Sequence, residues 1–125
     1  MMRALIVVAA LMGAAGVVLA ALGAHGGGTG SDLARLATAS SMLLFHAPVI
    51  LAVVLLAERQ LVQRHLAIAS TIGFAVGATL FASDLTVRDL VGHALFPMAA
   101  PSGGTILIGS WIVLALAGLL ARQKP

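Results

Sequence analysis

Histidines and an aspartate are the side chains that could do chemistry within the otherwise apolar parts of this chain. His46 lies inside a long apolar run, His25 follows another such run, and Asp84 closes a third. Ionisable groups within apolar segments are costly to bury, so they are functional candidates by default. Histidine suits proton transfer near neutral pH, and its neutral ring binds zinc, copper or iron. These three residues are therefore the candidate functional polar residues.

A metal site is one interpretation of this set. His25, His46 and Asp84 could form a two-histidine, one-carboxylate ligand set. They come from different segments, so their spacing carries no local geometry such as that of an HExxH motif. The sequence also contains no cysteine, no Ser-His-Asp order and no nucleophile elbow. We therefore expect no catalytic residue, no bound metal and no cofactor.

His46 by itself has two interpretations. The first is a histidine that joins two helices by a hydrogen bond. Its ring needs partners for one donor and one acceptor, and the Thr38 or Ser41 hydroxyl, the carbonyl group that Pro48 frees, or a neighbouring helix could supply them. The second is a proton relay or a metal ligand. In either case, Pro48 predicts a kink in this segment.

Two features follow the third apolar run. Asp84 and Arg88 form an i,i+4 pair at a helix end, which we interpret as a solvated cap with a salt bridge worth ~0.3–0.5 kcal/mol. A loop-and-cap motif comes next and consists of Pro101, Ser102, Gly103 and Gly104. In this motif we expect Ser102 to cap the last helix and the glycines to allow close backbone approach.

The elements that must position these side chains are long apolar segments. Hydrophobic residues make up 61 % of the 125 residues and charged residues 9 %, against ~45–50 % and ~25 % in soluble domains. So few charges cannot cover a water-soluble fold, and the excess apolar surface must meet lipid or a very large partner, of which lipid is the simpler interpretation. The segments span about 4–22, 41–57, 65–83 and 104–121, each close to the ~20 residues that a spanning helix needs. The sequence thus predicts one all-α domain over residues 1–125, an antiparallel bundle of four transmembrane helices.

Local patterns refine the spans. Ser31 or Thr29, with Asp32 after it, predicts a helix start ahead of the second span, so we expect an interfacial extension or kink from residue 31. In the third span, Gly73 and Gly77 form a GxxxG pattern that favours close packing against another helix.

Trp111 lies well inside the fourth span rather than in an interfacial belt. We therefore expect its ring to pack between helices.

Basic residues set the expected orientation. With the N-terminus in the cytoplasm, five basic residues lie inside and two outside; the five are Arg3, Arg59, Arg64, Arg122 and Lys124, and the two are Arg35 and Arg88. This excess predicts that both termini are cytoplasmic, an N-in/C-in topology. The basic residues form no patch or stripe, so we expect the lipid bilayer and no nucleic acid as a partner.

Several short runs together resemble a known family. They are Gly23-Ala24-His25-Gly26, Phe45-His46-Ala47, the run from Gly77 to Ser83, Pro101-Ser102-Gly103-Gly104 and Trp111. In this order they resemble the YgdD/YwdK-like family of small multi-spanning membrane proteins, the domain of unknown function 423 family. The resemblance covers nearly the whole chain. It implies a four-helix fold in the bacterial inner membrane and no established activity.

The chain departs from this family pattern at a few positions. It has Ala20-Ala21-Leu22 where the family usually has Gly-Ala-Phe, and Asp84 where serine is favoured. The resemblance therefore implies that His25 and His46 belong to the family pattern, whereas Asp84 and His93 are peculiar to this chain.

The absence of a catalytic set and the small-residue faces favour a non-enzymatic accessory or scaffold component of a larger membrane assembly, or a homo-oligomer. One alternative is a carrier or channel that moves protons, metal ions or a small solute past His46. A second alternative is a metal-dependent membrane enzyme that uses His25, His46 and Asp84.

Overall fold

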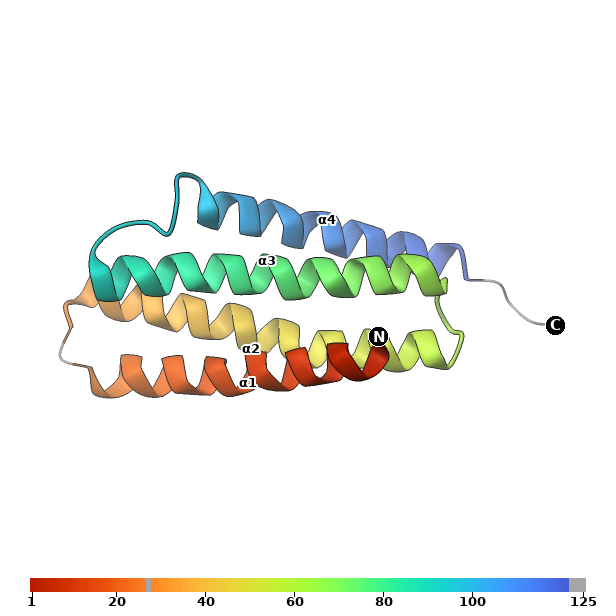
Figure 1. Ribbon diagram of the computed structural model, residues 1–125, viewed down its shortest axis with the longest axis horizontal. Helices are drawn as coiled ribbons and strands as arrows, with labels where there is room; N and C mark the ends of the chain where they lie inside the picture. The colour runs from red at the N-terminus through yellow and green to blue at the C-terminus, as the bar shows by residue number, and fades with distance from the viewer. Residues whose placement is uncertain (27, 122–125) are drawn as a thin grey trace.

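The computed structural model describes residues 1–26 and 28–121. Its helices are α1 (Met2–His25), α2 (Gly30–Glu58), α3 (Arg64–Val91) and α4 (Ala99–Leu119). Each of these four is long and apolar enough to cross a membrane, and the described residues form no strand. Successive helices run antiparallel (Figure 1), which confirms the predicted bundle of four transmembrane helices.

The second helix is continuous from its cap to its end. Thr29 occupies the N-cap position, and Asp32 Oδ2 accepts hydrogen bonds from the Thr29 hydroxyl at 2.6 Å and from its backbone N–H at 3.3 Å. The predicted extension from residue 31 is therefore helical and joins the span without a break. Pro48 lies inside this helix with its ring exposed.

The third helix continues to Val91, about two turns beyond the end predicted at residue 83. The charged residue at position 84 ends the apolar run but not the helix. Leu85, Thr86 and Val87 continue the helix beyond it. The helix ends at Gly92, whose φ of 83° places it in the left-handed region that glycine adopts without strain. The prediction that Asp84 stands at the helix end was therefore wrong.

The fourth helix begins earlier than the predicted residue 104. The predicted loop-and-cap motif is helical, and this holds for Pro101, Ser102, Gly103 and Gly104. Met98 holds the N-cap position with a φ of 67°, and the Ser102 backbone N–H donates to the Met98 carbonyl at 2.9 Å. Ser102 is therefore not the cap. Pro101 fits the first turn because the backbone N–H that it lacks would have no partner within the helix there.

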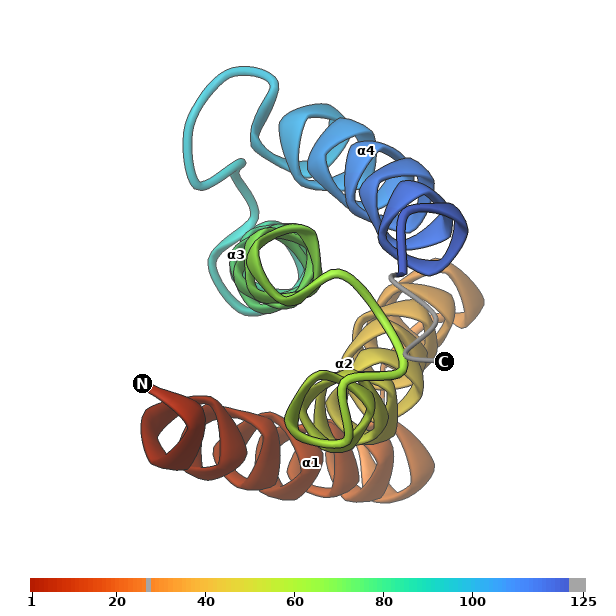
Figure 2. The ribbon, with the colours of Figure 1, turned by 90° about the vertical axis from the view of Figure 1, so that its right-hand side faces the viewer.

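Neighbours in sequence are neighbours in space in this fold. α1 packs on α2, α2 on α3 and α3 on α4, whereas α1 touches α3 only slightly. Within residues 1–26 and 28–121, no Cα atom of α4 lies within 8 Å of one in α2 or α1. Viewed from the end, α1 and α4 lie at opposite extremes of the molecule with α2 and α3 between them (Figure 2), so the helices do not close into a ring.

The interface between α3 and α4 is a close backbone contact. A Cβ atom on Gly77 would lie 2.9 Å from the Gly103 carbonyl oxygen, and one on Gly103 would lie 2.8 Å from the Gly77 carbonyl oxygen. One turn away, Gly73 faces the Ser110 hydroxyl. Glycine is thus required on both helices for this approach.

The two outer helices, α1 and α4, are each held by a single hydrogen bond to a neighbouring element. The Ser40 hydroxyl of α2 donates to the Gly16 carbonyl of α1 at 2.7 Å in a buried position. At the other side of the molecule, the Gln63 backbone N–H, just before α3, donates to the Ala117 carbonyl of α4 at 2.8 Å. The Ser40–Gly16 bond lies within the spanning segments, where the bilayer supplies no water, so it has no competing partner there.

Candidate functional site

His46 lies in the middle of α2 and is only 7 % exposed. Its Nδ1 atom is 2.7 Å from the Met42 carbonyl oxygen, one turn earlier in the same helix. A carbonyl oxygen only accepts, so Nδ1 carries the hydrogen and Nε2 keeps a free lone pair. The predicted hydrogen bond between helices is therefore wrong. The Thr38 and Ser41 hydroxyls instead donate to carbonyl groups within α2.

Across the bundle, the His46 ring meets two aromatic rings. Its centroid is 5.6 Å from that of Phe74 in α3 and 6.1 Å from that of Trp111 in α4. Phe74 and Trp111 meet edge to face, with centroids 4.8 Å apart. These three residues, called the aromatic cluster below, join α2 to α4 through side chains where their backbones do not touch. Trp111 is 47 % exposed, so its ring packs on the cluster with one side open.

Asp84 is fully buried, and both of its carboxylate oxygens are engaged. Oδ2 accepts from Arg88 Nε at 2.8 Å, and Oδ1 accepts from the Leu95 backbone N–H at 2.7 Å. The ion pair with Arg88 is thus present, but the interpretation of Asp84 as a solvated cap was wrong. The reason is that α3 continues past it and the following loop folds back over it. Asp84 anchors this loop to α3.

The three candidate polar residues do not come together. His25 is exposed at the end of α1, and His46 and Asp84 lie at different depths. Phe74, the α3 residue that meets the His46 ring, precedes Asp84 by a rise of about 15 Å along the helix. In the part of the chain that the structure describes, no group of three His, Cys, Asp or Glu residues could hold a metal ion. His93 is exposed in the loop, with Nδ1 2.8 Å from the Ala94 carbonyl oxygen.

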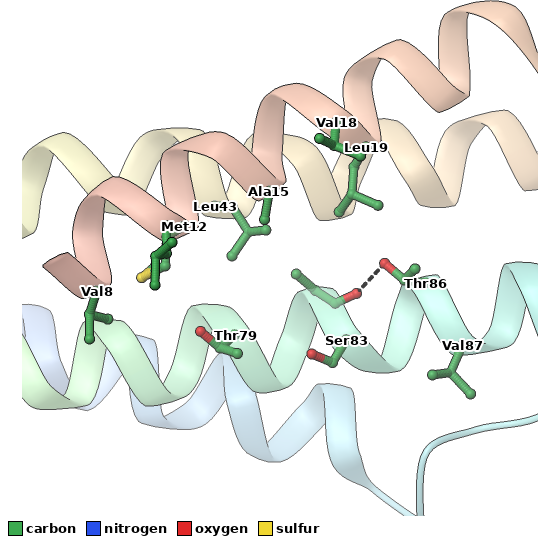
Figure 3. A pocket seen from close by; sticks show the side chains of 12 residues that line it. Val8, Met12, Ala15, Val18, Leu19, Leu43, Thr79, Ser83, Thr86 and Val87 are labelled. Carbon is green, nitrogen blue, oxygen red and sulfur yellow. Dashed lines mark hydrogen bonds between the residues drawn. The ribbon is translucent and has the colours of Figure 1, made fainter.

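A groove of about 580 Å³ separates α1 from α3 (Figure 3). We call it the α1/α3 groove; its lining is Val8, Leu11, Met12, Ala15, Val18, Leu19, Leu43, Thr79, Ala82, Ser83, Thr86 and Val87. The lining is apolar except for three hydroxyls on α3. Thr86 Oγ1 donates to the Ala82 carbonyl at 2.7 Å, whereas the Thr79 and Ser83 hydroxyls have no hydrogen-bond partner among the described residues.

Sequence reasoning did not single out this groove or Phe74. One signal was available: Thr79, Ser83 and Thr86 recur at i, i+4 and i+7, which places small polar side chains on one face of a helix. No comparable signal pairs Phe74 with His46, because the two residues stand on different helices.

The fold and these sites define a class, namely a small multi-pass membrane protein of four spanning helices. The family model described as "Protein of unknown function (DUF423)" matches residues 19–104. This match covers more than half of the chain, and the protein therefore belongs to the DUF423 family, as the sequence resemblance indicates. No curated protein and no solved structure matches the chain.

Proposed function

We propose that the protein is a non-enzymatic accessory component of a membrane assembly, and that its α1/α3 groove receives a transmembrane helix of a partner protein. The observation that carries this proposal is the second small-residue face of α3, which lines the groove and has no helix packed into it. In lipid, leucine-rich surfaces do not drive association, whereas small residues let helix backbones approach.

Helix α3 has two such faces. Gly73 and Gly77 lie against α4. Thr79 and Ser83 have the same spacing of four residues and line the groove. The centres of the two pairs are six residues apart, about 120° around a helix, so the two faces point in clearly different directions. The partner helix would occupy the groove face much as α4 occupies the glycine face.

The hydroxyls of the groove favour a polypeptide over a purely apolar occupant. Thr79 and Ser83 can each donate to a backbone or side-chain oxygen of an incoming helix, a contact worth about 0.6 kcal/mol in membrane proteins. The groove lining contains no Asp, Glu, Lys, Arg or His residue. An ion or proton carrier would need such groups along its path, so the groove supports docking better than transport.

We also propose that the protein lies in the bacterial cytoplasmic membrane with both termini in the cytoplasm. The support is the excess of basic residues at the ends of the chain and in the turn after Glu58. The chain has no cysteine, so the variants Gln60→Cys and Gly28→Cys each carry a single thiol. A thiol reagent that does not cross the membrane is then added outside intact cells that carry one variant or the other. Only the Gly28 position is expected to react with an impermeant reagent added outside.

Photo-crosslinking in native membranes tests the docking proposal. A benzoylphenylalanine at Val18 faces the groove, whereas one at Val17 provides a matched control on the same helix. The two valines are 57 % and 60 % exposed, so general accessibility does not distinguish them. We expect a discrete protein adduct from the Val18 position and lipid adducts alone from Val17.

The adduct mass identifies the occupant. An increase by the mass of another polypeptide supports an accessory role, and an increase by one further 12.6 kDa chain would identify a homo-oligomer instead. Lipid adducts alone at both positions would contradict the proposal.

A further inference from the structure

The aromatic cluster is a second site, on a different side of α3 from the groove, and the proposed docking of a partner helix makes no use of it. Position 74 of α3, which meets the cluster, lies about 140° around the helix from position 79, which lines the groove. We propose that the cluster binds a lipophilic alcohol or phenol, whose hydroxyl group pairs with His46 Nε2 and Trp111 Nε1.

The first support is an unpaired acceptor. His46 is more than nine-tenths buried, and its Nδ1 is committed to the Met42 carbonyl. Its Nε2 lone pair has no hydrogen-bond partner among the described residues. This Nε2 atom is also accessible from outside the protein. Among the described residues, the one side-chain polar atom that is both fully enclosed and without a partner is Asp89 Oδ1, so Nε2 is not fully enclosed. In a bilayer no water satisfies such an atom.

The second support is an unpaired donor on the neighbouring Trp111 ring. The Trp111 indole N–H donates to no residue that the structure describes, and the indole and imidazole centroids are 6.1 Å apart. Both nitrogens have fixed roles, since indole Nε1 only donates and His46 Nε2 in this tautomer only accepts. A hydroxyl group can do both at once: it donates to Nε2 and accepts from Nε1–H. An ether or a hydrocarbon cannot make the first of these bonds.

The surroundings define the rest of the ligand. The residues that flank the two nitrogen-bearing side chains on their own helices are exposed and apolar: Phe45 is 68 %, Ile108 66 % and Ile112 59 % exposed. The cluster itself contains no charged residue, so it offers an ion no counter-charge. The body of the ligand is therefore apolar, and its polar part is a single uncharged group.

Access is from the lipid, on the exposed side of the Trp111 ring. Side chains of α2 and α4 pack together elsewhere along these helices, but the Trp111 ring itself is half-exposed. A membrane-soluble molecule therefore meets the aromatic cluster at this ring.

The test uses the full-length protein in lipid nanodiscs and its own fluorescence. Trp111 is the single tryptophan of the chain, so its emission reports on the cluster alone. The probes are farnesol, a branched C15 alcohol, and farnesyl methyl ether, which has the same apolar body without the hydroxyl hydrogen. We expect a saturable shift of Trp111 emission with farnesol, and an affinity for the ether at least tenfold lower.

Two variants assign the acceptor. His46→Phe keeps a ring against Phe74 and Trp111 but removes the nitrogen, and is expected to lower the farnesol affinity to that of the ether. His46→Gln keeps a polar group able to accept, and is expected to recover part of the affinity. Circular dichroism and the unfolding midpoint of each variant check that the fold is kept.

Three results would overturn the proposal: equal responses to the alcohol and the ether, no saturable response to farnesol in the unmodified protein, or an unchanged farnesol affinity in a folded His46→Phe variant. The comparison of the two probes on the unmodified protein decides the question even where a variant fails to fold. The cross-linking from Val18 reports on the other face of α3, so its outcome is independent of this one.

Discussion

The two faces of α3 invite comparison, because both carry small residues at four-residue spacing and only one is filled. On the α4 side, Gly77 and Gly103 bring two backbones into contact. On the α1 side, Thr79 and Ser83 line a groove of about 580 Å³. Small residues thus permit close approach but do not by themselves bring a helix in.

Anchors at the helix ends account for the difference. α4 is held at its start by the loop that Asp84 anchors through Leu95, and near its end by the bond from Gln63 to Ala117. α1 is bonded sideways to α2 through Ser40 and has little contact with α3. Of these two faces of α3, the filled one is therefore the one whose partner helix is fixed near both ends.

The largest expected effect comes from Gly77→Leu. The new side chain must push α4 away, because even its Cβ would lie 2.9 Å from the Gly103 carbonyl oxygen, and overpacking of this kind costs about 3 kcal/mol. Gly109→Leu is the matched control, since a Cβ there has no atom within 4 Å. Unfolding by SDS in mixed micelles measures both. Equal losses in the two variants would refute the close contact as the source of stability.

Asp84→Ala is expected to cost about 2 kcal/mol in the same assay, because it leaves the Leu95 N–H without an acceptor and Arg88 without its partner. Arg88 is partly exposed and can turn to water, which limits the loss. Asp84→Asn keeps an oxygen for the Leu95 N–H and should lose less. A larger loss for Asn than for Ala would contradict the anchoring role.

Ser40→Ala removes the bond between α1 and α2 and is expected to lower the free energy of unfolding by about 0.6 kcal/mol, the average for such bonds in membrane proteins. The neighbouring Ser41→Ala serves as the control, because the Ser41 hydroxyl donates to Ala37 within its own helix. No change in Ser40→Ala relative to Ser41→Ala would mean that this bond does not hold α1.

The smallest effect on stability is expected from Ser83→Leu, which adds bulk to open space in the α1/α3 groove. We expect a change within about 0.5 kcal/mol, as for surface substitutions away from packed features, together with loss of the protein adduct from the Val18 position. A stable variant that still forms the adduct would show that the groove is not the docking surface.

The number and type of elements could be predicted from the sequence, because long apolar runs have one stable form in a bilayer. The ends could not. The apolar run of the third span ends at Asp84, whereas α3 continues until the Gly92 cap. The residues 101–104 resemble a loop in the sequence, but they are helical because a helix tolerates proline in its first turn.

The candidate site was predictable only in part. His46 stands out in the sequence as a polar residue in an apolar run. Its partners do not, because Phe74 and Trp111 are brought to it by the rotation of two other helices about their axes. The burial of Asp84 depends likewise on a loop that folds back, a tertiary contact that no local pattern encodes.

Because α1 is attached on one side only, its tilt is expected to depend on the thickness of the bilayer. A transmembrane helix meets a thinner or thicker hydrocarbon layer by changing its tilt. α1 is packed on α2 and scarcely on α3, so it can adjust its tilt more freely than α4, which is held at both ends. Such a tilt would widen or narrow the space that faces Thr79 and Ser83, so lipid chain length would change the room available there to the partner helix that we propose.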